Sequence, residues 1–184
     1  MKLTKRLAAV ILTAALSLVM LTACTNTLPP DLQPGLTPGG GSSDSGDGKT
    51  DASPDTQLDA YRQEVLRLVN AERTSRGITP LSMSNSRLTN AAQKRADEIT
   101  VTFSHTRPNG TQCSTVLDEY SVSWRAFGEN IAAGYPTPAS VVEGWMNSPG
   151  HRANILNSSY TQIGIGYVYD STNHRAYWSQ IFVG

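Results

Sequence analysis

One long segment, which has almost no large apolar side chains to bury in a core, restricts most how this chain can fold. From Thr25 to about Thr56 the sequence is rich in Pro, Gly, Ser and Asp and contains no aromatic residue. Such a composition cannot bury enough apolar surface to offset the entropy of ordering it. We therefore expect residues 24–57 to form a disordered tether, with a span of about 30 Å on average. Folded structure is then confined to residues 58–184, enough for one domain with a single core.

The first residues have the pattern of a bacterial export signal. Lys2, Lys5 and Arg6 precede the apolar stretch LAAVILTAALSLVML, which is shorter than the roughly 18 apolar residues typical of a spanning helix. The ending LTAC resembles the lipobox, which implies cleavage before Cys24 and lipid attachment to its sulfur. We predict a signal peptide over residues 1–23, a lipidated Cys24 and an extracytoplasmic protein anchored to the membrane. The alternative is an ordinary secretory signal with an incidental cysteine.

Charge and cysteine content narrow the possible functions. The chain has 15 Lys+Arg against 15 Asp+Glu, so no basic surface for nucleic acid is expected. If the lipobox uses Cys24, Cys113 has no partner, which excludes an intramolecular disulfide. We interpret Cys113 as a small buried packing residue. A catalytic thiol is the less favoured alternative, because no nucleophile signature surrounds it.

Residue periodicity predicts helices in the first half of the domain. Apolar residues at helical spacing favour a helix from Leu58, with Asp55 as a candidate cap and Gly77 as its stop. A second helix is predicted over residues 86–100. One face of it carries Leu88, Ala91, Ala92, Arg95, Ala96 and Ile99. A turn at residues 108–110 and a short helix over 114–120 are expected to follow.

The second half of the domain mixes strands with two further helices. Residues 123–135 have strand character, interrupted by Gly128 and Gly134. Thr137 and Pro138 are typical of a helix start, and Ser148 and Pro149 repeat that pattern. The alternation of residues 160–169 and the run 176–184 predict a β-hairpin. Helices early and strands late favour an α+β fold with helices packed on an antiparallel sheet.

Three titratable residues lie in Gly- or Pro-framed segments: His105 in FSHTRPNG, Glu129 in FGENIA and His151 in SPGHRANIL. The partial positive charge of a helix N-terminus keeps an imidazole such as His151 neutral, and thus able to bind a metal or accept a proton. Two imidazoles and a carboxylate would suit a zinc site with one open position, if the fold brings them together.

Each of these residues also has a purely structural interpretation. His105 could be a surface hydrogen-bonding residue, Glu129 could pair with Arg125, and His151 could bond a neighbouring carbonyl. His174 is expected in the solvated hairpin turn. No GxSxG motif indicates a serine nucleophile, and Ser148 is interpreted as a helix cap.

The order of several segments resembles the bacterial members of the CAP superfamily, named for cysteine-rich secretory proteins, antigen 5 and plant pathogenesis-related proteins. The segments are VNAERTSRGITPL, FSHTRPNG, GENIA, VVEGWMNSPGHRANIL, YTQIGIGY and YWSQIFVG. Over residues 58–184 the resemblance implies a three-layer α-β-α sandwich with a central antiparallel sheet. It also implies a cleft that gathers two histidines with one or two acidic residues.

The resemblance implies roles for particular residues. His105, Glu129 and His151 match the family's cleft residues and would form the metal site, with Asn130 and Ser148 as supporting neighbours. A second glutamate, present in many animal relatives, falls near Ser148 here, and the disulfide cysteines of animal and plant relatives are absent.

The sequence supports three hypotheses about function. The first is a membrane-anchored binding module that takes zinc or another divalent metal and a cell-envelope or host ligand. The second is a hydrolase in which Glu129 acts as general base on a water held by the histidines or their metal. The third is binding of a lipid or sterol in an apolar groove. Whether the domain is an enzyme, which ligand it takes and whether it oligomerises are left open by the sequence.

Overall fold

The computed structural model describes residues 54–184. The predicted signal peptide, the lipidation site at Cys24 and nearly all of the tether lie outside the described residues. Within the described part, no helix combines the length and the apolar character needed to cross a membrane.

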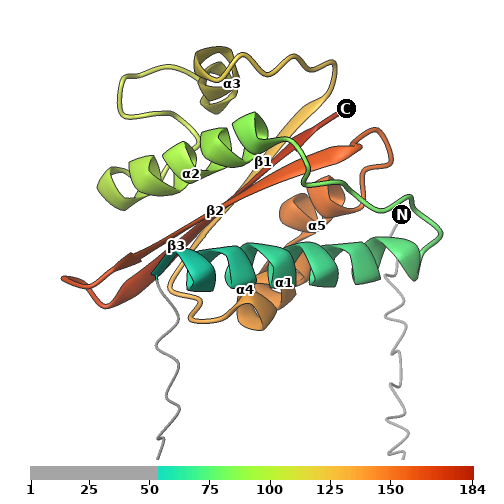
Figure 1. The fold of residues 1–184 in the computed structure, drawn as a ribbon, viewed down its shortest axis with the longest axis horizontal. Coiled ribbons are helices and arrows are strands. Elements are labelled where there is room, and N and C mark those ends of the chain that lie inside the picture. The colour runs from blue at the N-terminus through green and yellow to red at the C-terminus, as the bar shows by residue number, and fades with distance from the viewer. Residues whose placement is uncertain (1–53) are drawn as a thin grey trace, which may run out of the picture. The chain divides into compact units, whose positions relative to one another are not determined.

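The centre of the fold is a three-stranded antiparallel sheet (Figure 1). Its strands are β1 (Phe127–Ala133), β2 (Gln162–Asp170) and β3 (Arg175–Val183), in the order β1-β3-β2. Ile181 of β3 is paired with Glu129 of β1 on one side and with Gly164 of β2 on the other. These three residues therefore share one face of the sheet. The predicted hairpin is confirmed as β2 and β3, and His174 lies exposed in its turn.

Helices cover both faces of this sheet, which confirms the three-layer α+β prediction. On one face lie α2 (Ser86–Val101), the short 3-10 helix η1 (Cys113–Thr115) and α3 (Val116–Glu119). On the other lie α1 (Pro54–Thr74), α4 (Pro138–Asn147) and α5 (Pro149–Ile155) (Figure 1). Each layer buries its own apolar cluster against the sheet. The larger cluster centres on Trp145 and Trp178, and the smaller on Leu88 and Ile181.

Two glycines let α2 approach the sheet unusually closely. A β-carbon added at Gly164 would collide with the Leu88 carbonyl, and one at Gly166 with the Ala92 carbonyl. The hydroxyl of Ser179 donates to the Ala92 carbonyl at 2.6 Å from the adjacent strand. These contacts set the distance between α2 and the sheet.

A buried arginine connects α1 to the segment after α5. Arg73 is fully buried and donates to four backbone carbonyls, those of Thr79, Ile155, Asn157 and Tyr160, at 2.8–3.1 Å. The guanidinium therefore pairs with a carbonyl at the end of α5 and with carbonyls in the segments that follow α1 and α5. Burial lowers the pKa of Arg73 from its ordinary high value.

Some local predictions were right and others wrong. The buried face of α2 consists of the six residues predicted for it, and Thr137 caps α4 in a capping box with Ser140. Asp55 does not cap α1, because the helix already begins at Pro54. Gly128 does not interrupt its strand, since β1 runs through it and the Tyr160 ring occupies the space of a side chain.

Candidate functional site

His105 lies in a short loop closed by main-chain pairing. An antiparallel bridge joins Thr106 to Gln112, and the Arg107 amide donates to the Thr111 carbonyl at 2.9 Å. Gly110 completes the predicted turn with a φ of +83°, which glycine adopts without strain. Because the bridge pairs residues 106 and 112, it places their outer neighbours, His105 and Cys113, opposite each other.

Glu129 lies on β1 beneath this loop, with its side chain only 2% exposed. One carboxylate oxygen, Oε1, accepts a hydrogen bond from Arg95 Nε at 2.7 Å, and Oε2 lies 2.6 Å from His105 Nδ1. The alternative pairing of Glu129 with Arg125 is wrong, because the buried partner is Arg95 of α2. A buried carboxylate with two charge-assisted contacts is held firmly in place.

This contact belongs to a longer chain of charges. Arg95 also donates to Glu98 at 2.6 Å, and Arg107 connects Glu98 to Glu119 at 2.6 Å each. Burial by itself would raise the pKa of Glu98, but the two arginines outweigh it and lower that pKa. The same contacts raise the pKa of Arg107. The His105 loop is thereby tied to α2 and α3.

His105 is the more basic of the two imidazoles. The Cys113 side chain and then the Glu129 carboxylate raise the pKa of His105 to about 9, although partial burial opposes this. Its side chain is 58% exposed. In the metal-free protein the ring is therefore protonated at neutral pH, with one N–H directed at Glu129.

His151, in the first turn of α5, is the less basic of the two imidazoles. Burial and then the charge of His105 lower the pKa of His151. Both causes favour the neutral imidazole, and burial rather than the helix N-terminus is the larger of them. Its backbone carbonyl accepts from Asn130 Nδ2 at 3.1 Å, which places the predicted supporting residue Asn130 directly beneath it. Ser148 occupies the N-cap position of α5, as predicted, but its side chain makes no capping hydrogen bond.

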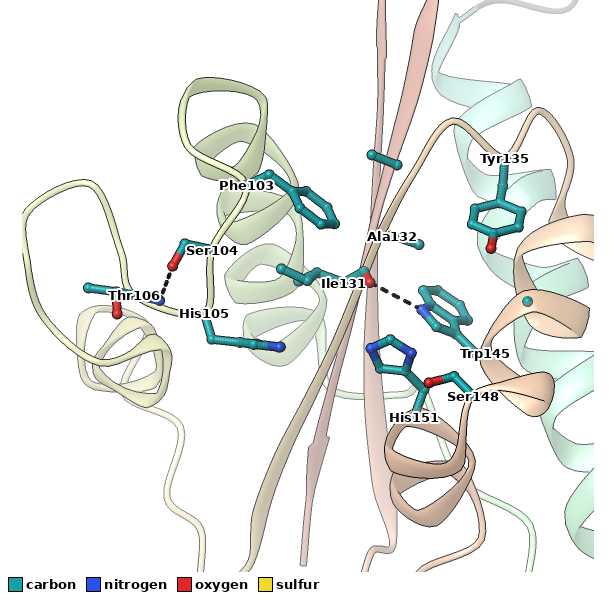
Figure 2. Close-up of a pocket in the computed structure, with 12 residues that line it drawn as sticks. Phe103, Ser104, His105, Thr106, Ile131, Ala132, Tyr135, Trp145, Ser148 and His151 are labelled. Atoms are coloured by element: carbon teal, nitrogen blue, oxygen red, sulfur yellow. Dashed lines mark hydrogen bonds between the residues drawn. The ribbon is translucent and has the colours of Figure 1, made fainter.

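Both imidazoles line one cavity of about 530 Å³ (Figure 2). His105 enters it from the loop after α2, and His151 and Ser148 enter it from the segment around the start of α5. The remaining wall is largely apolar and includes Phe103, Ile131, Ala132, Tyr135 and Trp145. No carboxylate is among the lining residues, so Glu129 acts on this cavity only through His105.

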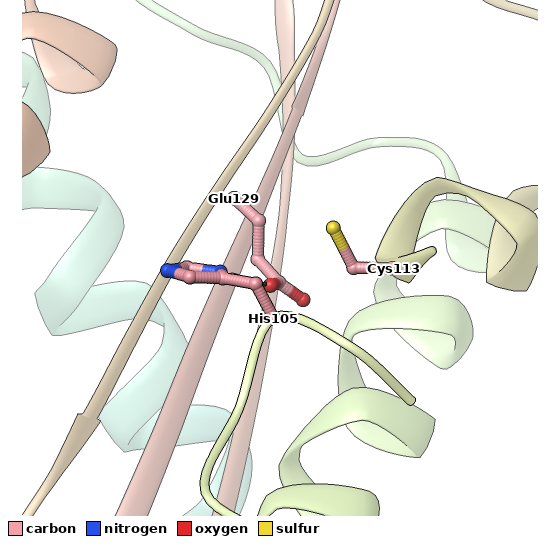
Figure 3. Close-up of side chains that lie close together, drawn as sticks. All are labelled: His105, Cys113 and Glu129. Atoms are coloured by element: carbon pink, nitrogen blue, oxygen red, sulfur yellow. Dashed lines mark hydrogen bonds and ion pairs between the residues drawn. The ribbon is translucent and has the colours of Figure 1, made fainter. Parts of the chain in front are cut away.

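Cys113 contradicts the expectation of a buried packing residue. Its thiol is partly exposed and belongs to no apolar cluster of the described residues. One potential ligand atom each from Cys113, His105 and Glu129 lie within 4.8 Å of one another (Figure 3). His151 is not a member of that group, although it faces the same cavity.

The fold therefore brings His105 directly onto Glu129 and places His151 on the opposite wall. Arg95 and Cys113 were not predicted as site residues. Arg95 had a visible signal, since it is an arginine on the apolar face of a helix, where a cation needs a buried partner. For Cys113 the sequence indicated only the turn at residues 108–110, and not the Thr106–Gln112 pairing that brings the cysteine to His105.

Comparisons with known proteins agree with this architecture. The sequence model of the cysteine-rich secretory protein family, CAP, matches residues 66–182. The uncharacterised protein YkwD of Bacillus subtilis is 38% identical over 136 residues, which cover 73% of this chain and 51% of YkwD. The uncharacterised membrane protein YlbC of Bacillus subtilis is 33% identical over 122 residues, which cover 66% of this chain and 34% of YlbC.

A solved structure shares the fold. An extracellular protein containing an SCP domain from Bacillus anthracis superposes with a TM-score of 0.63 at 28% identity, covering 72% of this chain and 44% of that one. The chain thus spans about half the length of YkwD and about a third of YlbC. These relatives carry further sequence beyond the shared domain.

Proposed function

The chain belongs to the cysteine-rich secretory protein (CAP) family, and we propose that it acts outside the cytoplasm as a membrane-anchored binding domain. Its cavity would take a divalent metal ion at His105 together with a ligand from the cell envelope or a host. The location is supported by the Bacillus anthracis relative, which is described as extracellular, and by YlbC, which is described as a membrane protein.

The observation that carries the proposal is the position of the two imidazoles. His105 and His151 face one cavity that contains no other titratable group apart from Tyr135. Imidazole nitrogens are favoured ligands of zinc and similar divalent ions. A carboxylate on the second ring nitrogen of a metal-binding histidine orients the ring and makes it a better donor, and Glu129 occupies that position on His105.

The apolar wall suits the second part of the proposal. A cavity of about 530 Å³ lies within the range of small-molecule sites, and it combines aromatic side chains with a few polar groups. Phe103 and Tyr135 stay 54% and 37% exposed on its two sides. A ligand with an apolar portion would bury both rings and place its polar portion near the histidines.

The arrangement favours binding over general-base hydrolysis. Both Glu129 oxygens already accept charged partners, and the side chain is shielded from the cavity by His105. A general base needs direct hydrogen-bond access to the water that it activates. We therefore assign Glu129 to positioning His105.

Zinc titration by calorimetry tests the metal. Replacing His105 or His151 with alanine is expected to weaken zinc binding at least about tenfold. His174→Asn is the matched control, because that histidine lies exposed in the hairpin turn at a φ of +50°, which asparagine tolerates. If His105→Ala binds zinc as tightly as the control, the proposed metal site is wrong.

Membrane fractionation tests the anchor. The parent chain is expected in the membrane fraction and to partition into detergent. Cys24→Ser removes the acceptor sulfur and is expected to leave the chain unlipidated, whereas Cys113→Ser should not alter lipidation. Unchanged lipid labelling of the Cys24→Ser variant would contradict the anchor.

A further inference from the structure

We infer that Cys113 is a metal ligand, and that His105, Cys113 and Glu129 together form a site for a thiophilic divalent ion such as zinc. The inference rests on the metal part of the proposed function but moves the ion to the Glu129 side of the His105 ring. There Glu129 would bind the ion directly, and Cys113 would add a sulfur donor. It begins from the group of three ligand atoms within 4.8 Å of one another (Figure 3).

The main chain holds the sulfur in place without a metal. The Thr106–Gln112 bridge sets His105 and Cys113 side by side, and the Asn109 carboxamide oxygen accepts from the Thr111 amide at 3.0 Å across the turn. Just beyond Cys113, α3 buries Val116 and Leu117 against α2. Both ends of the loop are thus anchored, so little ordering would be needed on metal binding.

Arg107 fastens the same loop from its middle. Its guanidinium donates to Glu98, Glu119 and the Thr115 hydroxyl at 2.6–3.2 Å, and the side chain is 3% exposed. Arg107 lies between His105 and Cys113 in the sequence, so its contacts restrain the loop that carries both donors. The separation of the two donors is therefore a property of the fold rather than of a free loop.

The local charge balance suits a divalent cation. The connected chain of Arg95, Arg107, Glu98, Glu119 and Glu129 has a net charge of −1. A thiolate at Cys113 would bring the total to −2, and a divalent ion would neutralise it. On binding, the ion would replace the protons of the His105 ring and of the Cys113 thiol, so the net charge of the site would stay at zero.

The donor set also selects among metals. Zinc is held by thiolate, imidazole and carboxylate ligands in a four-coordinate site, whereas magnesium and calcium prefer oxygen ligands alone. Three donors from this group leave one coordination position, which a water molecule could fill. Cobalt(II) can replace zinc and report the sulfur by its thiolate-to-metal charge-transfer absorption.

The test is cobalt titration of the full chain carrying Cys24→Ser, which leaves Cys113 as its single thiol. A near-ultraviolet charge-transfer band is expected on binding. Adding Cys113→Ser should abolish the band and weaken binding at least about tenfold. With His151→Ala the band should persist at saturating cobalt, because the three donors remain. A thermal melt close to that of the parent shows that each variant is folded.

The outcomes separate this inference from the proposed function. Cobalt binding that depends on His105 but shows no charge-transfer band would overturn the role of Cys113 and leave the histidine site standing. An absence of binding by both cobalt and zinc in the parent would overturn both. A band that survives Cys113→Ser would also refute the inference, because the sulfur could not be its source.

Discussion

At the scale of single residues, the site depends on one buried arginine. Arg95 is fully buried and contacts Glu129, Glu98 and the Ser104 carbonyl at 2.6–2.8 Å. Its contact with Oε1 of Glu129 leaves the second oxygen of that carboxylate directed at His105. Removing one partner of a buried ion pair leaves an uncompensated charge, so replacing either residue is expected to destabilise the fold.

Glu129→Gln is expected to lower the pKa of His105 from about 9 toward its ordinary value. The amide keeps a similar shape but no longer carries the charge that stabilises the imidazolium. The Cys113 side chain remains, so some elevation should persist. The measurement is an NMR titration of the His105 ring protons, with those of exposed His174 as internal reference. An unchanged His105 titration would show that Glu129 does not control its protonation.

At the scale of elements, the position of α2 sets the geometry of the site. The helix supplies Arg95 and Glu98, and the loop that follows it supplies His105. Gly164 and Gly166 of β2 allow its backbone to lie directly on the sheet. A small displacement of α2 would separate Arg95 from Glu129, because one lies on the helix and the other on the strand.

Gly166→Ala is expected to destabilise the fold by about 1–3 kcal/mol, since the added methyl group collides with the Ala92 carbonyl. The matched control is Gly150→Ala in α5, where a β-carbon has no neighbour within 4 Å. The control should be neutral or stabilising by up to about 1 kcal/mol, because alanine has the higher helix propensity. Urea unfolding measures both. Equal effects of the two substitutions would contradict this account of the α2–sheet contact.

At the scale of the whole molecule, the two cavity histidines couple stability to pH in opposite directions. The pKa of His105 is raised in the folded state, so its contribution is complete below about pH 6.5 and is lost as pH rises toward 9. The pKa of His151 is lowered, so its contribution is present above its ordinary pKa and is lost as pH falls through the folded value. The metal-free domain should be most stable near neutral pH.

The difference in unfolding free energy between the parent and His105→Gln tests this linkage. Without bound metal, it is expected to be largest near pH 6 and to shrink steadily as pH approaches 9. Chemical denaturation in the presence of a chelator, at several pH values, provides the measurement. A difference that stays constant across this range would show that the protonated His105 contributes nothing to folding.

Local interactions were predictable from the sequence. The buried face of α2, the cap of α4 and the β2–β3 hairpin depend on residues a few positions apart, where helical and strand periodicity act directly. The segment order indicated the family, and the family fold implied that His105, Glu129 and His151 would be near one another.

The sequence by itself thus determined the elements, the layer order and the three residues expected around the cavity. Only the tertiary structure decided their partners: Arg95 lies 34 positions from Glu129, and Cys113 meets His105 through one isolated bridge. It also decided that His105 contacts Glu129 while His151 lies on the opposite wall. The physical reason is that such contacts depend on how closely α2 packs on the sheet and on how the loop between Thr106 and Gln112 closes. Neither feature produces a periodic pattern of residues in the sequence.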